Sequence, residues 1–558
     1  MLKSGRLIGA VLDLPKGPLG ESTHPVIANS FGNATPQPGA GSDANADTVA
    51  DDIRTLHALG YGQELLRRMS GFSNFAISLS IICILAGGIT SFHLAMCSVG
   101  GAAIGVGWPL GTLLSLAFAA TMGQLASAFP TAGGLYHWAA ILGGRAWGWA
   151  TAWLNLAGLI TVLAAINVGT YLFLAASLGP HLGFAPDAYG ESMSAWIQLA
   201  AVIAITVSQA LINHRGIQVT TRLTDFSGYW ILTVAVLLTG SLLWFAPRLE
   251  IGRLITFNNY SGAAGGHVWP ETRNLVGLFA LCLLLPAYTI TGFDASSHTS
   301  EETIGAAAAV PRAIVKAVLI SGVFGWIMLS AMVLAIPDMD RGAAQGSHVF
   351  FNTVNSLFPS WLAIGLYAGI GLAQYLCGLA TVTSTSRVAY AFARDGGTPM
   401  APFVRQVSPR FRTPAVAIWS VSLLSIAFAA YTPVYSTITS VCVIFLYVSY
   451  AIPTAIGLVT YRRSWKKMGP WSLGCWFRPL AVVCVIGCIL LIAIGVQPPN
   501  DRALWILLGT MVTLVVFWFG HQRARFVGPP QGVLTSGRQH EIEALEQAVG
   551  QTSAGIQP

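Results

Sequence analysis

Residues 286–303, PAYTITGFDASSHTSEET, place acidic and hydroxyl side chains directly after an apolar run, LVGLFALCLLL. Asp294 is the acid nearest to that run. An ionisable group inside an apolar segment is costly in lipid, so it usually faces an interior cavity and acts there. The Asp294 carboxylate could cap the helix that restarts after it by accepting from free N–H groups, or it could act as a gate or touch a bound molecule. We expect Glu301 and Glu302 to lie near the aqueous end of the segment in a structural role.

The same segment contains residues that interrupt helices. Pro286 and Gly292 fall within it, and an earlier apolar segment, ILAGGITS (84–91), contains Gly87 and Gly88 near its middle. Proline removes a backbone donor and glycine weakens a helix, so both segments are predicted to break.

Two broken helices offer complementary chemistry. The half-helix after AGGIT would expose backbone N–H groups, which suit a carboxylate. Unwound carbonyls around Thr289–Gly292 could hold an ammonium group. If the two breaks are adjacent, they form a receptor for a zwitterion such as an amino acid or related amine.

A third group of polar side chains could bind a cation. Thr381, Ser384 and Thr385 share one helix face by their spacing. Their hydroxyls could ligate a sodium ion together with carbonyls of the first break, such as that of Ala86. Alternatively, they could bond back to the carbonyls of their own helix.

The composition shows what surrounds these segments. Of 558 residues, 54% are hydrophobic and 9% are charged, whereas soluble proteins carry about 25% charged residues. Apolar runs of about 20 residues, long enough to cross a bilayer, recur along the chain. The sequence therefore predicts an all-α integral membrane protein that contacts the lipid bilayer.

The net charge of +7 does not indicate a nucleic-acid partner. The basic residues form short clusters between apolar runs, and no basic stripe with interleaved aromatics occurs. The eight cysteines show neither a disulfide framework nor a CxxC pair, so we expect no metal site. We also expect no cofactor other than a possible coupling ion, Na⁺ or H⁺.

Twelve transmembrane helices are predicted, with helices 1 and 6 broken. Their approximate spans are 72–94, 99–127, 147–178, 195–213, 226–246, 274–297, 312–336, 360–391, 414–431, 435–460, 479–497 and 503–521. They form one domain, 56–525. We expect residues 1–55 to be a disordered cytoplasmic tail and 526–558 a second cytoplasmic tail.

The distribution of Lys and Arg sets the expected orientation. With a cytoplasmic N-terminus, the inner connections hold most basic residues, including the cluster at 462–467, and the outer ones hold few. The outer residues are Arg248, Arg253, Arg273, Arg341 and Arg502. This bias predicts a multi-pass protein of the plasma or inner membrane with both termini in the cytoplasm.

The two broken helices stand at matching positions, five helices apart. This spacing is typical of transporters built from inverted repeats, with the binding site at the breaks. The repeats would cover about 72–246 and 274–460, followed by two extra helices at about 479–521.

Motifs of hydrolytic or phosphoryl-transfer enzymes are absent from the sequence, including GxxxxGK[ST], HExxH and GxSxG. The chain is therefore not expected to be an enzyme or a self-contained ATP-driven pump. The remaining function classes are secondary transport and a passive pathway through the membrane.

Four sequence segments resemble the amino acid–polyamine–organocation superfamily of permeases, and most of all its amino acid/choline branch, which includes GABA and choline permeases. The segments are LGYGQELLRRMSGFSNFAISLSII (59–82), QLASAFPTAGGLYHWAA, TGFDASSHTSEET and TSTSRVAYAFARDGG. The resemblance covers roughly residues 55–525. It implies the LeuT-type fold of five-plus-five inverted repeats with two further helices, and solute–cation transport by alternating access.

The resemblance also implies positions for a substrate. Its carboxyl end would meet the backbone at Gly87, Gly88 and Ile89. Its amine would meet carbonyls near the second break, with a phenylalanine as gate; the residues are Thr289, Ile290, Gly292 and Phe293.

Two departures from common patterns of the family leave the coupling ion open between Na⁺ and H⁺. Relatives often have glutamate where Gln124 stands, and some proton-coupled relatives use a lysine in helix 5, near Tyr229–Ile231, where this chain has none.

We therefore expect a secondary transporter of an amino acid or GABA-like amine that is coupled to a cation. Choline, ethanolamine or a polyamine is the alternative substrate class. Outside transport, a membrane sensor would need a signalling domain, for which the tails are too short, and a membrane-embedded enzyme would need paired intramembrane acids or histidines. The sequence does not indicate the oligomeric state.

Overall fold

The computed structural model describes residues 40–184, 191–408, 410–431 and 435–530, together with 537, 539, 540, 542–544, 546 and 547. Within these residues the regular structure is helical, apart from two isolated bridges, Met69–Thr303 and Tyr461–Trp465. The α-helices are α1 (Ala40–Ala58), α2 (Gly71–Ile82), α3 (Gly87–Thr90), α4 (Phe92–Val99), α5 (Trp108–Ala128), α6 (Leu135–Gly143), α7 (Arg145–Ser177), α8 (Glu191–His214), α9 (Ile217–Phe245), α10 (Leu275–Cys282), α11 (Leu284–Thr289), α12 (Ala295–His298), α13 (Ala306–Ala335), α14 (Met339–Ala344), α15 (Val349–Leu357), α16 (Ser360–Arg394), α17 (Ala401–Val404), α18 (Ala415–Tyr431), α19 (Tyr435–Thr460), α20 (Phe477–Gly495), α21 (Asp501–Phe517) and α22 (Arg523–Arg525).

Among the described residues, ten helical segments are long and apolar enough to cross a membrane. Two shorter apolar segments, Leu275–Thr289 and Ala415–Tyr431, coincide with the predicted sixth and ninth helices. The prediction of an all-helical membrane protein is thus confirmed for the part of the chain that the structure describes.

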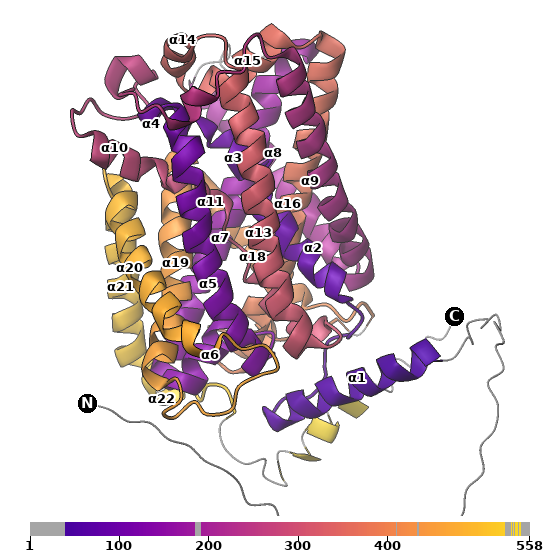
Figure 1. Cartoon of the computed structure of the whole chain (residues 1–558). Helices are drawn as coiled ribbons and strands as arrows, with labels where there is room; N and C mark the ends of the chain where they lie inside the picture. The colour runs from indigo at the N-terminus through magenta and orange to yellow at the C-terminus, as the bar shows by residue number, and fades with distance from the viewer. Residues whose placement is uncertain are drawn as a thin grey trace, which may run out of the picture. The chain divides into compact units, whose positions relative to one another are not determined.

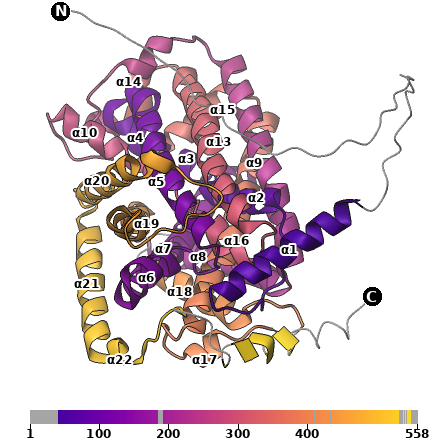
Figure 2. The same ribbon diagram turned by 60° about the horizontal axis from the view of Figure 1, so that its bottom comes forward.

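The long helices run side by side (Figure 1). Helix α7 packs against α16 and α19, while α13 packs against α2, α5 and α9. Helices α20 and α21 lie together on one flank beside α19 in both views (Figure 2). Val515, Val516 and Phe519, in and just after α21, are more than half exposed, as expected of side chains that face lipid.

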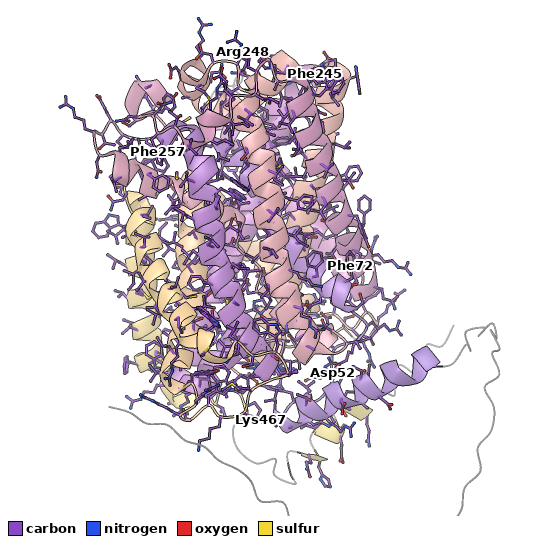
Figure 3. All side chains as sticks on the ribbon, viewed as in Figure 1. Asp52, Phe72, Phe245, Arg248, Phe257 and Lys467 are labelled. Carbon is purple, nitrogen blue, oxygen red and sulfur yellow. The ribbon has the colours of Figure 1, made fainter. Side chains whose placement is uncertain are left out.

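The two ends of the helix bundle differ in their residues. Asp52 and Lys467 lie at one end, which we call the Lys467 end, and Arg248 lies at the other, the Arg248 end (Figure 3). Helices α6 and α22 are at the Lys467 end, and α14 and α15 are at the Arg248 end (Figure 1).

Part of the predicted N-terminal tail is ordered. Residues 1–39 lie outside the described residues, but residues 40–55 belong to α1, so the prediction of disorder is wrong for them. Two contacts explain the order. Asp52 accepts a hydrogen bond from the Gly305 N–H at 2.7 Å, and Leu56 is buried.

Candidate functional site

The first interruption lies just before the glycines that predicted it. Helix α2 ends at Ile82 and α3 begins at Gly87, so the irregular residues are Cys83–Ala86. Cys83 has φ 1° and ψ 91°, outside the helical region. Gly87 and Gly88 therefore open the second half-helix instead of forming the break.

Gly87 permits a close approach between the two interrupted helices. A Cβ at Gly87 would lie 2.9 Å from both Cα and Oγ1 of Thr289, the last residue of α11. Real Cβ atoms essentially never come this close to backbone. A side chain at Gly87 would therefore push α3 away from α11.

The second interruption covers residues 290–294, between α11 and α12. Gly292 adopts φ +82°, which favours glycine, and a Cβ there would lie 2.3 Å from Cγ2 of Ile81 in α2. The Gly292 N–H donates to the Tyr450 hydroxyl at 3.2 Å. Each break thus touches the other broken helix, as a zwitterion receptor requires.

The structure gives the predicted substrate positions different surroundings. The Gly87 N–H donates to the Cys83 carbonyl at 3.1 Å, and the Gly292 carbonyl accepts from the Ala295 N–H at 3.1 Å. The Thr289 hydroxyl is buried and has no hydrogen-bond partner among the described residues. A buried polar atom without a partner is costly, so Thr289 Oγ1 is suited to bonding a bound polar molecule.

Phe293 is fully buried, and its ring centroid lies 5.0 Å from that of Tyr450. Ile290 is also fully buried, whereas Ile89 lines the cavity described below.

The predicted cation ligands divide into two groups. Thr385 and Thr381 donate to carbonyls of their own helix, at 2.7 Å and 2.9 Å, which is the alternative that the sequence left open. The Ala86 carbonyl accepts the Thr90 hydroxyl at 2.5 Å. Ser384 differs, because its buried hydroxyl has no partner among the described residues.

Asp294 joins three helices. Its Oδ1 accepts the Tyr450 hydroxyl at 2.8 Å, and its Oδ2 accepts Asn155 Nδ2 at 3.0 Å and lies 2.9 Å from His298 Nε2. All four side chains are fully or almost fully buried. The carboxylate therefore links α12 and its preceding turn to α7 and α19.

The prediction that the Asp294 carboxylate caps the restarting helix is wrong in this structure, because it accepts no backbone N–H there. Asp294 itself has helical dihedrals, φ −65° and ψ −16°. Its backbone carbonyl accepts the N–H groups of Ser297 and His298, while its side chain turns to α7 and α19. The gating role remains a prediction.

Sequence reasoning missed the three partners of Asp294. His298 stands four residues after it, on the same helical face, and this spacing was a usable signal. Asn155 and Tyr450 are 139 and 156 residues away in the chain, and no local pattern pairs them with Asp294.

Two buried ion pairs close the Lys467 end. Glu301 binds Arg394 through two bonds of 2.9 Å and 3.1 Å and also accepts the Ala132 N–H. Glu302 binds Arg387 through two bonds of 3.2 Å. The glutamates are fully buried, although we expected them at the aqueous end. These ion pairs link the turn that follows α12 to helix α16.

A third carboxylate at this end, that of Asp395, contacts three aromatic side chains. Asp395 accepts hydrogen bonds from the hydroxyls of Tyr61 and Tyr136, and it lies 3.1 Å from His137 Nε2. Burial, together with the Asp395 carboxylate, raises the pKa of the Tyr61 phenol well above its ordinary value. Tyr61 therefore stays a neutral donor to Asp395.

Arg67 and Asp52 lie beside the turn that carries these glutamates. Arg67 donates to the carbonyls of Thr303 and Ser300, at 2.5 Å and 3.2 Å, and lies 3.5 Å from Asp52. Burial raises the pKa of the Asp52 carboxyl, although the Gly305 N–H and Arg67 favour its ionised form.

A cavity of about 500 Å³ lies on the Arg248 side of α3. It is lined by Ile89, Thr90, His93, Phe351 and Tyr435, among others. The Tyr435 hydroxyl is 2.8 Å from Thr90 Oγ1 and donates to the Tyr288 hydroxyl at 3.4 Å. Tyr435 thus separates the cavity from α11, while the Lys467 end is closed by ion pairs.

A helical membrane protein with a polar site between two interrupted helices, closed at one end and hollowed toward the other, has the architecture of a membrane transporter. The chain belongs to the amino acid permease family, whose model matches residues 69–519. The predicted superfamily is confirmed, and so is the prediction of a transporter instead of an enzyme.

Curated relatives agree with the family. The chain is 30% identical to the amino-acid permease BAT1 of Arabidopsis thaliana over 527 residues, covering 89% of this chain and 100% of that protein. It is 32% identical to the rice BAT1 homolog, covering 79% and 86%. It is also 26% identical to a putative polyamine transporter of Candida albicans, covering 87% and 90%.

Proposed function

We propose that this permease moves an amino acid or GABA-like amine across the plasma or inner membrane by alternating access, coupled to a cation. The observation that carries the proposal is the contact between the two interruptions, where Gly87 lets α3 approach Thr289. Breaks that meet bring N–H groups and free carbonyls to one place, and a zwitterion needs both.

The proposed binding mode divides the substrate between the two breaks. The N–H groups of Gly88 and Ile89 hold the carboxylate. The Gly87 N–H already bonds the Cys83 carbonyl, so Gly87 contributes by letting α3 approach α11. Carbonyls of Thr289, Ile290 and Gly292 hold the amine; the Gly292 carbonyl keeps a second lone pair for it. Phe293, packed on Tyr450, and Asp294 act as gates.

The proposed architecture has twelve spans in two inverted repeats, residues 72–246 and 274–460, with two extra helices. The ten long and two shorter apolar segments support it. The Lys467 end faces the cytoplasm, since the basic cluster at 462–467 belongs there by the positive-inside rule. Residues 1–55 and 526–558 are then the two cytoplasmic ends.

In this orientation the structure favours access from outside. The cavity opens toward the outer side, and the buried ion pairs of Glu301 and Glu302 close the cytoplasmic side. Alternating access would break these pairs while Tyr435 seals the cavity.

The name of the Candida albicans relative favours a second substrate class. That protein is called a putative polyamine transporter, so choline, ethanolamine or a polyamine is the alternative cargo. A cation without a carboxylate would use the carbonyls of the second break and leave the N–H groups of α3 unused.

The test is uptake into proteoliposomes of a labelled panel of amino acids, GABA, choline, ethanolamine and putrescine, under separate proton and sodium gradients. Uptake of one or more zwitterions supports the proposal. Uptake of choline, ethanolamine or putrescine alone supports the second class, and no uptake of any compound overturns both.

A further inference from the structure

We infer that Asp294 and His298 together form the proton-binding site that couples transport to a proton gradient. This inference rests on the proposed function and names its ion and the place of that ion. A carboxylate and an imidazole are buried together beside the second interruption.

The two side chains form an isolated pair inside the helix bundle. Asp294 Oδ2 and His298 Nε2 are 2.9 Å apart, and both side chains are fully buried. The other partners of the carboxylate, Asn155 and Tyr450, are neutral donors. They orient the carboxylate but cannot neutralise its charge.

The second ring nitrogen of His298 is unoccupied. When Nε2 donates to the Asp294 carboxylate, Nδ1 is an acceptor, and it is buried without a partner among the described residues. The pair then carries a charge of −1. Binding one proton at Nδ1 gives an imidazolium beside a carboxylate, with no net charge. Burial in a medium of low polarity favours this second state, because an uncompensated charge there is costly.

Among the residues that the structure describes, no neighbouring cation is available to neutralise the pair instead. Helix α2 has no ionisable residue, and Arg312 and Lys316 on α13 are exposed. On α16, Arg387 and Arg394 already bind Glu302 and Glu301.

The other described elements near the pair contribute no further free charge. On α6, Tyr136 and His137 bind Asp395; on α19, Tyr447 bonds Ser115; and the one charged residue of α7, Arg145, opens that helix, ten residues from Asn155. Among the described groups facing the pair, the unused proton acceptor is therefore His298 Nδ1.

The pair also connects the substrate site to the cytoplasmic closure. Tyr450 accepts the Gly292 N–H and donates to Asp294, so a change at the second break reaches the carboxylate through one hydroxyl. On the other side, a Cβ at Gly134 would lie 3.0 Å from His298 Nδ1. Gly134 has no side chain, so the turn before α6 approaches Nδ1 with its backbone.

Coupling of transport to the proton gradient then follows because water reaches the Asp294–His298 pair from one side of the membrane at a time. The pair takes a proton from water while the site communicates with the outside, and substrate binding at the second break fixes Tyr450 and Asp294. When the Lys467 end opens, water reaches Nδ1 past Gly134 and the proton leaves to the cytoplasm. One proton is bound and the same proton is released, with no other change in bonding.

The experiment uses the full chain in proteoliposomes with pyranine, a pH-sensitive dye, in the lumen. The probe is the labelled compound that the wild type takes up in the panel above. For the wild type we expect addition of this compound to acidify the lumen, and an inward gradient of one pH unit to drive about tenfold accumulation per proton.

His298→Asn should abolish both lumen acidification and gradient-driven accumulation, while exchange of labelled for unlabelled compound continues. Asp294→Asn should abolish the same acidification and accumulation. His137→Asn is the matched control, since it also removes a buried histidine bound to an aspartate. It should keep the acidification. The inference is overturned if either Asp294 or His298 variant acidifies the lumen as the wild type does, or if wild-type uptake ignores the pH gradient. If the wild type transports nothing, the proposed function fails instead.

A spectroscopic measurement decides the matter if His298→Asn loses exchange. In the His137→Asn background, His298 is the aspartate-bound histidine among the described residues. Nitrogen-15 NMR of histidine-labelled protein, with distances to labelled aspartate carboxylates, should show this ring changing from singly to doubly protonated when the proton is bound. A ring that keeps one protonation state throughout overturns the inference.

Discussion

Gly87 of α3 and Thr289 of α11 lie so close that a Cβ on Gly87 would be 2.9 Å from the Thr289 Cα. The two residues are the points at which the interrupted helices meet. The Thr289 hydroxyl at this place also has no hydrogen-bond partner in the part of the chain that the structure describes. The relationship ties backbone spacing directly to the proposed binding site.

Gly87→Ala should therefore impair uptake. Forcing an extra carbon into a packed contact costs about 1–3 kcal/mol, and about 1.4 kcal/mol corresponds to tenfold. We expect uptake to fall roughly ten- to hundredfold while the protein still inserts, measured by initial rates at matched protein content. Gly240→Ala, in α9 with open space around the added carbon, should transport normally. Normal uptake by Gly87→Ala would contradict the role given to this contact.

The sequence predicted both interruptions because glycine and proline weaken helices locally. It placed the second one correctly, at Gly292, and the first a few residues late, since Gly87 and Gly88 follow the irregular residues Cys83–Ala86. Glycine is needed at position 87 because α3 approaches Thr289 there. Only the packed structure reveals this contact.

Distant partners could not be predicted in the same way. Asn155 and Tyr450 reach Asp294 from helices far away in the chain, and composition contains no information on which polar residues of different helices meet. Capping was inferred for Asp294 from its position before a helix. In the structure the carboxylate instead forms tertiary hydrogen bonds, and these replace the helix cap that the local sequence favours.

Tyr435→Phe tests the closure of the outer cavity. The variant loses the hydroxyl contacts with Thr90 and Tyr288. A hydrogen bond contributes about 0.5–1.5 kcal/mol, so the closed, substrate-holding state should weaken and the apparent KM for uptake should rise about two- to tenfold. Tyr431→Phe, at an exposed ring, is the control. An unchanged KM for Tyr435→Phe would show that this hydroxyl does not hold the closure.

Asp52→Ala should loosen residues 45–58 of α1. The Asp52 carboxylate accepts the Gly305 N–H at 2.7 Å, so we expect the Gly305 amide to exchange with solvent deuterium faster in the variant. Asp51→Ala removes the adjacent acid, which is exposed and pairs with Arg54, and should not change that exchange. Equal protection of Gly305 in both variants would rule out the contact.

The attachment of this segment should also depend on pH. Because burial raises the pKa of Asp52 above its ordinary 3.8, the attached carboxyl binds its proton more tightly than the detached one. Attachment is then strongest below pH 3.8 and weakens as the pH rises through the raised pKa. Asp52→Asn keeps an acceptor for the Gly305 N–H without an ionisable group. The protection factor of Gly305 should fall with pH over this window in the wild type and stay level in Asp52→Asn.

Glu301→Gln should open the cytoplasmic side, because it leaves the Arg394 guanidinium, 9% exposed, without its carboxylate. Breaking a buried pair from one side costs about 3–5 kcal/mol, whereas removing both charges is often nearly neutral. The double variant Glu301→Gln/Arg394→Gln should therefore keep the cytoplasmic side closer to its wild-type closure than the single variant does.

The reporter is Thr299→Cys, a buried position, in a Cys475→Ser background that removes the exposed thiol. Modification by an impermeant maleimide from the Lys467 side should speed up about a hundredfold or more in Glu301→Gln. Glu250→Gln breaks an exposed pair with Arg253 at the opposite end and should leave the rate unchanged. A double variant that reacts as fast as Glu301→Gln would mean that the pair holds the closure by its mutual attraction, and that the unpaired charge is not what opens it.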